Sequence, residues 1–206
     1  MAVKILIATT NPNKVREIRP LLADLPIELI TLADLAPVPE PEESAMTFWE
    51  NARIKALGYA RSTGCITVAE DSGFEIEAMD GEPGVHSARF MGAKTSYPNR
   101  FYEIFRRIES ESRTARFVTA LAVAREHEIL FETETSVDGE VAYEPKGQHG
   151  FGYDPIFFYP PFGVTTAQLP DHDKAAISHR ARAFRDLRRW LSSENAIKTF
   201  RTATVS

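Results

Sequence analysis

Residues 3–14 read Val3-Lys4-Ile5-Leu6-Ile7-Ala8-Thr9-Thr10-Asn11-Pro12-Asn13-Lys14. The first six form a short apolar run rich in β-branched side chains, which predicts a buried strand. Asn11 can cap a helix whose first turn holds Pro12, because the proline nitrogen needs no hydrogen-bond partner at that position. Apolar residues then recur at helical spacing, at Val15, Ile18 and Leu22. The segment therefore predicts a strand that leads directly into a helix.

The rest of the chain continues to mix helices and strands, without internal repeats. Thr47-Phe48-Trp49-Glu50 fits a capping box, so we expect a helix from there to about Ser62, before Gly64. Cys65 to Ala69 predicts a second buried strand, ending directly in Glu70-Asp71-Ser72-Gly73. Further elements are expected as a strand near 74–78, a helix over 101–108, a hairpin of strands at 116–124 and 128–137, and a final helix over 177–191. The fold class is α/β, and we expect a single domain over residues 1–191 followed by a C-terminal tail at 192–206.

Composition excludes several classes of protein. Of the 206 residues, 43% are hydrophobic and 26% are charged, as in ordinary soluble globular proteins. The formal net charge of −5 argues against nonspecific binding to nucleic acid, which depends on broad basic surfaces. The single cysteine, Cys65, cannot form an internal disulfide and fits a reducing compartment. The apolar run at Val3 to Ala8 is too short for a signal peptide or a membrane span, so we expect a cytoplasmic protein that binds neither nucleic acid nor membranes.

The junction at Thr9 to Lys14 is the first candidate site. It joins the end of a strand to the start of a helix, where unpaired backbone N–H groups and the helix dipole favour an anion. Two hydroxyls, two amides and a lysine add further donors. The segment is not a Walker A loop, because the glycine spacing and the final Lys-Ser/Thr pair are missing. An ordinary strand-to-helix turn with asparagine caps would explain the same residues.

Glu70 and Asp71 form the second candidate site. They follow a predicted strand without a break, at the carboxyl end, where open α/β sheets place their ligands. Glu42 and Glu43, in the preceding acidic loop, can supply a further carboxylate. Oxygen ligands of this kind suit Mg²⁺, and a carboxylate beside the metal can accept a proton from an attacking water. A solvated acidic turn is the alternative interpretation.

The segment Gly147 to Pro155 reads Gly-Gln-His-Gly-Phe-Gly-Tyr-Asp-Pro and is the third candidate site. Its glycines let backbone and ligand approach closely, and its two aromatic rings can pack against a flat ligand such as a nucleobase. Asp154 can orient such a ligand by hydrogen bonding. A glycine-rich hairpin loop whose aromatic side chains cover the core is the alternative.

Cationic residues cluster near the end of the chain. Lys174 precedes Ser178-His179-Arg180 on the final predicted helix or its first turn. His179 suits a general base, or a hydrogen-bonding group that positions the substrate. Arg180 can bind phosphate with its planar fork, or belong to the solvated run of arginines that follows it.

Taken together, these motifs resemble the inosine triphosphate pyrophosphatases, also called the Ham1-like family. The resemblance covers roughly Lys4 to Leu191 and rests on blocks in a fixed order, at residues 8–14, 47–52, 70–73, 83–89, 150–155 and 177–180. It implies hydrolysis of inosine, deoxyinosine and xanthosine triphosphates between the α- and β-phosphates, giving the monophosphate and pyrophosphate. Such an enzyme clears deaminated purines from the nucleotide pool. The implied fold is an elongated, two-lobed mixed sheet flanked by helices, with the active-site cleft between the lobes, and the implied assembly is a homodimer.

The resemblance also implies roles for individual residues. Asp71 would accept the proton from water, and Mg²⁺ would be held by Glu42 and Asp71, with Glu70 as a further candidate. The implied substrate-binding residues are Thr9, Thr10, Asn11, Pro12, Asn13, Lys14, Lys55, Ser72, Phe151, Gly152, Tyr153, Asp154, Lys174, His179 and Arg180.

The chain departs from the family pattern at two places. Thr10 and Asn13 stand where the first block commonly has glycines, and Glu70 stands where an aspartate is common. Three other functions compete with this interpretation. They are a septum-inhibition-type nucleotide pyrophosphatase, a phosphatase that releases orthophosphate, and a nucleotide-binding regulator without turnover.

Overall fold

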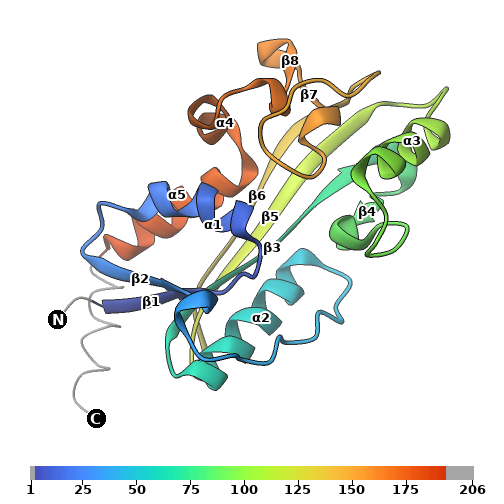
Figure 1. The fold of residues 1–206 in the computed structure, drawn as a ribbon. Helices are drawn as coiled ribbons and strands as arrows, with labels where there is room; N and C mark the ends of the chain where they lie inside the picture. Colours follow the sequence, from blue (N-terminus) through green and yellow to red (C-terminus); the bar gives the residue numbers. More distant parts are fainter. Residues whose placement is uncertain (1–2, 194–206) are drawn as a thin grey trace. The chain divides into compact units, whose positions relative to one another are not determined.

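The structure is a computed structural model that describes residues 3–193. Its strands are β1 (Val3–Ile7), β2 (Ile27–Thr31), β3 (Ile66–Ile76), β4 (Pro83–Gly84), β5 (Thr114–Arg125), β6 (Glu128–Val141), β7 (Phe157–Tyr159) and β8 (Val164–Thr165). Its α-helices are α1 (Pro12–Leu22), α2 (Phe48–Thr63), α3 (Tyr97–Arg107), α4 (Asp171–Ile177) and α5 (His179–Leu191). The strands form a mixed sheet in the order β2-β1-β3-β5-β6-β7-β8, with β4 paired to β3 (Figure 1). The predicted α/β class, a mixed sheet flanked by helices, is confirmed.

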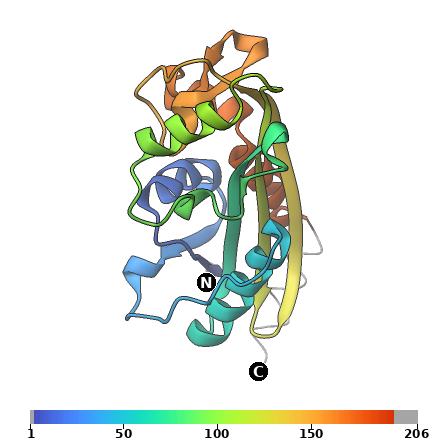
Figure 2. The same ribbon diagram turned by 90° about the vertical axis from the view of Figure 1, so that its right-hand side faces the viewer.

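The chain divides into two compact units. The first combines residues up to Asp71 with Ala120–Glu134 and the segment from Arg180 onward, and the second combines Ser72–Thr119 with Thr135–His179. The long strands β3, β5 and β6 contribute residues to both units. Figure 2 shows β5 and β6 as the long hairpin that the sequence predicts.

In the first unit, β1 pairs in parallel with both β2 and β3. Ile5, Ile7 and Val68 lie on one face of these strands and pack against apolar residues of α1 and α5. Helix α2 lies on the opposite face (Figure 1). The ends of α2 are those that the sequence predicts, because the Thr47 hydroxyl accepts from the backbone N–H of Glu50 at 3.2 Å and Gly64 ends the helix with a left-handed φ of 69°.

The second unit has its own core, built around aromatic rings. Phe74 from β3, Phe117 from β5 and Phe157 from β7 meet with ring centroids 4.6–5.9 Å apart. The ring of Tyr153 stacks on Phe74 at 5.2 Å. Helix α3 covers the cluster with Phe101 and Ile104, among others. The loop that carries Tyr153 is therefore anchored in the core of this unit.

Two predicted boundaries are wrong. Strand β3 does not end at Ala69 but runs on to Ile76, because Phe74 and Ile76 pack in the core and the polar side chains between have partners. The predicted final helix is interrupted at Ser178, whose backbone is extended at φ −66° and ψ 146°. Strands β2, β4, β7 and β8 and helix α4 were not predicted. Helix α5 ends at Leu191, and most of the predicted tail at 192–206 lies outside the described residues.

Between residues 3 and 193, no helix combines the length and the apolar character that crossing a membrane requires.

Candidate active site

Glu70 and Asp71 are neighbours in β3 and point to opposite faces of the sheet, because side chains alternate along a strand. Val68, two residues before Glu70, packs on the α1 and α5 face. It pairs with Ile7, the last residue of β1, so Glu70 lies just beyond the end of β1. The strand register thus brings Glu70 to the point where the Thr9 to Lys14 segment begins.

Glu70 is the centre of a buried group of charges. Its Oε1 atom accepts a hydrogen bond from Arg180 Nε at 2.7 Å and lies 3.5 Å from Lys14 Nζ. A second nitrogen of Arg180 donates to Glu17 Oε2 at 2.6 Å. The side chains of Glu70 and Arg180 are almost fully buried. The Oε2 atom of Glu70 is also buried and has no hydrogen-bond partner within residues 3–193.

The charges in this group stabilise one another. Burial alone would raise the pKa of Glu70, but the cations Arg180 and Lys14 outweigh burial and lower that pKa below its ordinary value. Burial lowers the pKa of Lys14, while Glu70 opposes the shift. Burial likewise disfavours the charged form of Arg180, but Glu70 and Glu17 raise its pKa overall. Glu70 is therefore ionised at neutral pH, in an ion pair with Arg180.

Asp71 faces α2 and meets a different set of partners. Its Oδ1 atom accepts from Lys55 Nζ at 3.2 Å, and the same ammonium lies 3.3 Å from Glu43 Oε1. Its Oδ2 atom accepts from Asn51 Nδ2 at 3.2 Å. Burial raises the pKa of Asp71, with Lys55 acting against the shift and Glu43 adding to it. One buried lysine thus joins two carboxylates from separate segments of the chain.

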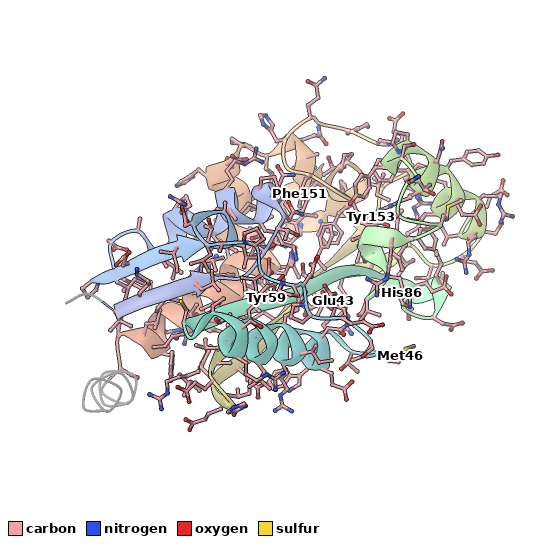
Figure 3. The ribbon with its side chains drawn as sticks, turned by 60° about the horizontal axis from the view of Figure 1, so that its bottom comes forward. Glu43, Met46, Tyr59, His86, Phe151 and Tyr153 are labelled. Atoms are coloured by element: carbon pink, nitrogen blue, oxygen red, sulfur yellow. The ribbon has the colours of Figure 1, made fainter. Side chains whose placement is uncertain are left out.

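The acidic loop before α2 is held in place by contacts with that helix. Asn51 accepts from the backbone N–H of Ala45 at 3.0 Å and donates to the carbonyl of the same residue. Gly58, inside α2, lies so close to the loop that a Cβ atom there would be 2.5 Å from Pro41 Cγ. Figure 3 shows Glu43 on this loop. Its carboxylate lies against Lys55, whereas the Glu42 side chain is exposed.

The segment Thr9 to Lys14 forms the predicted helix cap. The Asn11 side chain accepts from the backbone N–H of Asn13 at 2.9 Å, and the Thr9 hydroxyl accepts from the backbone N–H of Asn11 at 3.2 Å. Helix α1 follows with Pro12 in its first turn. The helix therefore presents its positive end beside Lys14, which favours an anion.

The charge balance of the first unit's cluster favours a divalent cation. The cations Lys14, Lys55 and Arg180 stand against Glu17, Glu43, Glu70 and Asp71, which leaves one excess negative charge. A triphosphate adds about four negative charges at neutral pH, so its binding requires further positive charge.

The carboxylates fit Mg²⁺, which takes hard oxygen ligands. Glu43 and Asp71 already share one cation, the Lys55 ammonium, and Glu70 offers an unpaired oxygen. No group of three or more His, Cys, Asp or Glu side chains in residues 3–193 is arranged to hold a metal by itself. A bound ion would therefore complete its shell with water and substrate oxygens, as Mg²⁺ usually does.

Asp154 organises the second unit's cluster. Its Oδ2 atom accepts from the backbone N–H of Phe151 at 2.7 Å and from Lys174 Nζ at 2.5 Å. Its Oδ1 atom accepts from the Thr166 hydroxyl at 2.9 Å. Gly150 leaves the space for this pair, because a Cβ atom there would lie 2.1 Å from Asp154 Oδ2. The carboxylate is almost fully buried, so it shapes the loop and places Lys174.

The two aromatic residues of the loop, labelled in Figure 3, differ in exposure. Tyr153 is buried and donates its hydroxyl to the carbonyl of Ser87 at 2.9 Å. Phe151 is half-buried, with Lys174 Nζ 5.2 Å from the centre of its ring. His179 lies in the same unit, where its ring stacks on Phe117 at 4.8 Å. Of these three rings, Phe151 is the one exposed enough to pack against a flat ligand.

The order and spacing of these residues match the Ham1 family, whose profile covers residues 5–190. The chain belongs to the Ham1 family. Among similar Ham1 sequences, a dITP/XTP pyrophosphatase of Thermus thermophilus is 44% identical over 186 residues, covering 89% of each chain. One of an Exiguobacterium species is 41% identical over 185 residues, covering 89% of this chain and 94% of the relative.

Solved Ham1 structures have the same fold. A HAM1 protein from Coxiella burnetii matches with a TM-score of 0.86 and 37% identity, over 92% of this chain and 98% of the other. The Ham1 protein of Staphylococcus aureus matches with a TM-score of 0.82 and 34% identity, over 91% and 97% of the two chains.

In this Ham1 chain, the residues that the sequence analysis singled out fall into two clusters. The first unit holds Thr9, Thr10, Asn11, Pro12, Asn13, Lys14, Lys55, Glu70, Asp71 and Arg180, and the second holds Ser72, Phe151, Gly152, Tyr153, Asp154, Lys174 and His179. Glu42, predicted as a metal ligand, is exposed, and the adjacent Glu43 contacts Lys55.

Several polar residues of these clusters were not predicted. Asn51 lies four residues before Lys55, which was predicted, on the buried face of α2, and this spacing could have revealed a polar partner beneath that helix. Glu17 lies three residues after Lys14 on α1, and this spacing indicates a shared site less clearly than that of Asn51 and Lys55. No local pattern marks Thr166 as a partner of Asp154.

Proposed function

We propose that the protein is a pyrophosphohydrolase of inosine, deoxyinosine and xanthosine triphosphates. It releases the nucleoside monophosphate and pyrophosphate, and in the cell it removes deaminated purine nucleotides from the precursor pool. The arrangement that carries this proposal is the buried Asp71, joined through Lys55 to Glu43, with Lys14 in the first turn of α1 beside the neighbouring Glu70. The names of the similar proteins from Thermus thermophilus and Exiguobacterium support the substrate class.

The first unit's cluster handles the phosphates. The backbone N–H groups at Thr9 to Asn13 and the Lys14 ammonium bind phosphate oxygens, and Lys55 neutralises charge beside Asp71. Asp71 and Glu43 would hold Mg²⁺, which when bound would supply positive charge beside the α-phosphate. We replace Glu42 with Glu43 in this set, because Glu43 shares a cation with Asp71. Glu70 remains a further candidate through its unpaired oxygen.

Asp71 accepts the proton of the attacking water. The water oxygen forms a bond to the α-phosphorus as the bond between that phosphorus and the bridging oxygen breaks, and pyrophosphate leaves with the electron pair of the broken bond. Asn51 and Lys55 hold the carboxylate in one orientation throughout. Phosphoryl transfer depends mainly on such positioning and on charge neutralisation.

Arg180 binds carboxylates of the protein itself, in addition to any role in binding phosphate. Two of its nitrogens donate to Glu70 and Glu17. It therefore fixes Glu70, which in turn lies beside Lys14.

The second unit's cluster binds the base and sugar. The half-buried ring of Phe151 stacks on the purine, Gly152 leaves space for it, and Ser72 contacts the substrate. Lys174 and His179 donate to the oxygen at position 6, which deaminated purines carry and adenine lacks. An amino group at that position would leave these donors unpaired, at about 1–3 kcal/mol each.

Product analysis tests the proposed function directly. We would incubate the protein with inosine triphosphate and Mg²⁺ and resolve the phosphorus products by ³¹P nuclear magnetic resonance. The expected products are inosine monophosphate and pyrophosphate, with little turnover of adenosine triphosphate and none after chelation of the metal. Orthophosphate as the first product would identify a phosphatase instead, and nucleotide binding without any product would identify a regulator.

We also propose a homodimer that acts in the cytoplasm, on the grounds of the family resemblance and the single cysteine. Light scattering coupled to gel filtration measures the mass in solution. A particle of one chain's mass, 23.1 kDa, at micromolar concentration would contradict the dimer.

A further inference from the structure

Arg100, in α3, is a buried cation without an acidic partner. Its side chain is 2% exposed, and within residues 3–193 it takes part in no ion pair with a carboxylate. Its guanidinium donates instead to two backbone carbonyls, those of Ser87 at 3.1 Å and Gly92 at 3.2 Å. Its Nε atom is buried and unpaired in the same part of the chain. A buried charge without a counter-charge is costly, so the backbone groups that Arg100 holds in place indicate what it contributes.

Both carbonyls belong to the segment 84–92, which has no part in the proposed reaction. Ser87 makes several of the hydrogen bonds that connect that segment to its neighbours. Its carbonyl accepts from Arg100 and also from the hydroxyl of Tyr153, at 2.9 Å. Its own hydroxyl donates to the carbonyl of Gly84 at 2.6 Å and accepts from the backbone N–H of Phe74 at 2.8 Å. One serine therefore ties together β3, the segment 84–92 and the glycine loop.

Tyr153 connects these hydrogen bonds to the residues that we propose bind the purine base. Its ring stacks on Phe74 at 5.2 Å and meets the edge of Tyr97 at 5.4 Å. The next residue, Asp154, holds the backbone of Phe151 and the ammonium of Lys174. A shift of Tyr153 would therefore move both the stacking ring and the donor.

We propose that Arg100, acting through the Ser87 carbonyl and the Tyr153 hydroxyl, positions the Gly150–Asp154 loop and so sets selectivity for the purine base. Arg100 touches no substrate and is a positioning residue. The assignment rests on the proposed function, because it presumes that this loop binds the base. Arginine suits the task because its planar fork donates to two separate carbonyls, whereas a lysine ammonium is a single point.

We call the contacts of Arg100 and Tyr153 with the Ser87 carbonyl the clamp. Two variants test the clamp against a matched control. Tyr153→Phe removes only the hydroxyl, and Arg100→Lys keeps the charge but loses the fork. The control is Tyr102→Phe, which removes a tyrosine hydroxyl from the same helix as Arg100 at a position that is 71% exposed. We expect each test variant to raise KM for inosine triphosphate by about 5- to 10-fold, with kcat changed by less than about 2-fold. Selectivity for inosine over adenosine triphosphate falls in both, and the control matches wild type.

A second readout does not depend on activity. Amide hydrogen exchange should accelerate by about 10-fold at Phe151 and within 84–92 in both test variants, and not in Tyr102→Phe. The Arg100→Lys/Tyr153→Phe double variant should exceed the stronger single variant only slightly, because both changes act through the Ser87 carbonyl.

The outcomes separate the two proposals. Unchanged exchange at Phe151 in the test variants, or a lower Tm with unchanged KM and selectivity, would overturn the clamp. If Arg100→Lys does not fold, Tyr153→Phe decides the matter alone. Failure of the wild-type protein to hydrolyse inosine triphosphate would contradict the proposed function. The hydrogen-exchange data would still show whether Arg100 and Tyr153 hold the loop in place.

Discussion

Glu70 and Asp71 are adjacent in β3, yet their environments move their pKa values in opposite directions. The Glu70 carboxylate faces Arg180 and Lys14, and its pKa is lowered. Burial raises the pKa of Asp71, despite the nearby Lys55. The strand alternation that separates them gives one carboxylate a structural ion pair and leaves the other suited to proton transfer.

Asp71→Asn should lower kcat by about 10²- to 10⁴-fold, because the amide cannot accept the proton of the attacking water. Binding of inosine triphosphate, measured by calorimetry in the presence of Ca²⁺, should persist. Asp24→Asn is the control, since Asp24 pairs with Arg188 at the surface. Wild-type turnover in Asp71→Asn would remove this residue from the catalytic role.

Glu70→Gln should destabilise the fold by about 3–5 kcal/mol, because it leaves Arg180 with a reduced set of buried negative partners. Urea unfolding measures the loss. Glu28→Gln, which breaks the exposed pair with Lys4, should cost less than about 1 kcal/mol. Equal losses in the two variants would show that the buried ion pair contributes no more than the exposed one.

The same ion pair predicts an acid dependence of stability. The folded pKa of Glu70 is lowered, so its contribution is complete above the unfolded value of 4.5 and is lost as the pH falls through the folded value. We expect the unfolding free energy of the wild type to decline below about pH 4.5 more steeply than that of Glu70→Gln. Parallel curves for the two proteins would contradict the assignment.

Glu43→Gln should raise the Mg²⁺ concentration for half-maximal activity by roughly 10-fold, as expected when a ligand or its close neighbour is lost. Glu42→Gln is the matched control, because it removes the same charge from the exposed adjacent position. Titration of activity with Mg²⁺ compares them. A larger effect in Glu42→Gln would restore the original prediction.

Gly150→Ala should cost more stability than Gly163→Ala. Both glycines have a left-handed backbone, with φ of 71° and 67°, so both substitutions carry a strain of about 1–2 kcal/mol. A Cβ atom at Gly150 also collides with the Asp154 carboxylate, whereas nothing lies within 4 Å of one at Gly163. Thermal unfolding gives the difference, and KM for inosine triphosphate should rise only in Gly150→Ala.

Local patterns predicted much of this molecule. The Asn11 and Thr47 caps and the Gly64 helix end are all where the sequence places them, because each depends on neighbours within a few residues. The break at Ser178 was missed, because it lies inside a stretch whose composition suits one helix. Strand β3 was predicted to end at Ala69, because the two adjacent acids that follow suggest a turn unless their distant partners are known.

The partners of the candidate site were harder to predict. Glu42 and Glu43 have the same chemistry, and only the packing of their loop on α2 distinguishes them. The sequence indicated that Arg180 was important, but its pairing with Glu17 spans 163 positions and has no local signature.

Gly58 allows the acidic loop that carries Glu43 to pack closely against α2. Glycine inside a helix lowers helix stability by about 1 kcal/mol relative to alanine, and α2 carries it at the point where Pro41 rests. A methyl group there would strengthen the isolated helix and yet push the acidic loop, with Glu43, away from Lys55. The weakest helix former in α2 thus lets the acidic loop pack where Glu43 meets Lys55, although it has no polar side chain of its own.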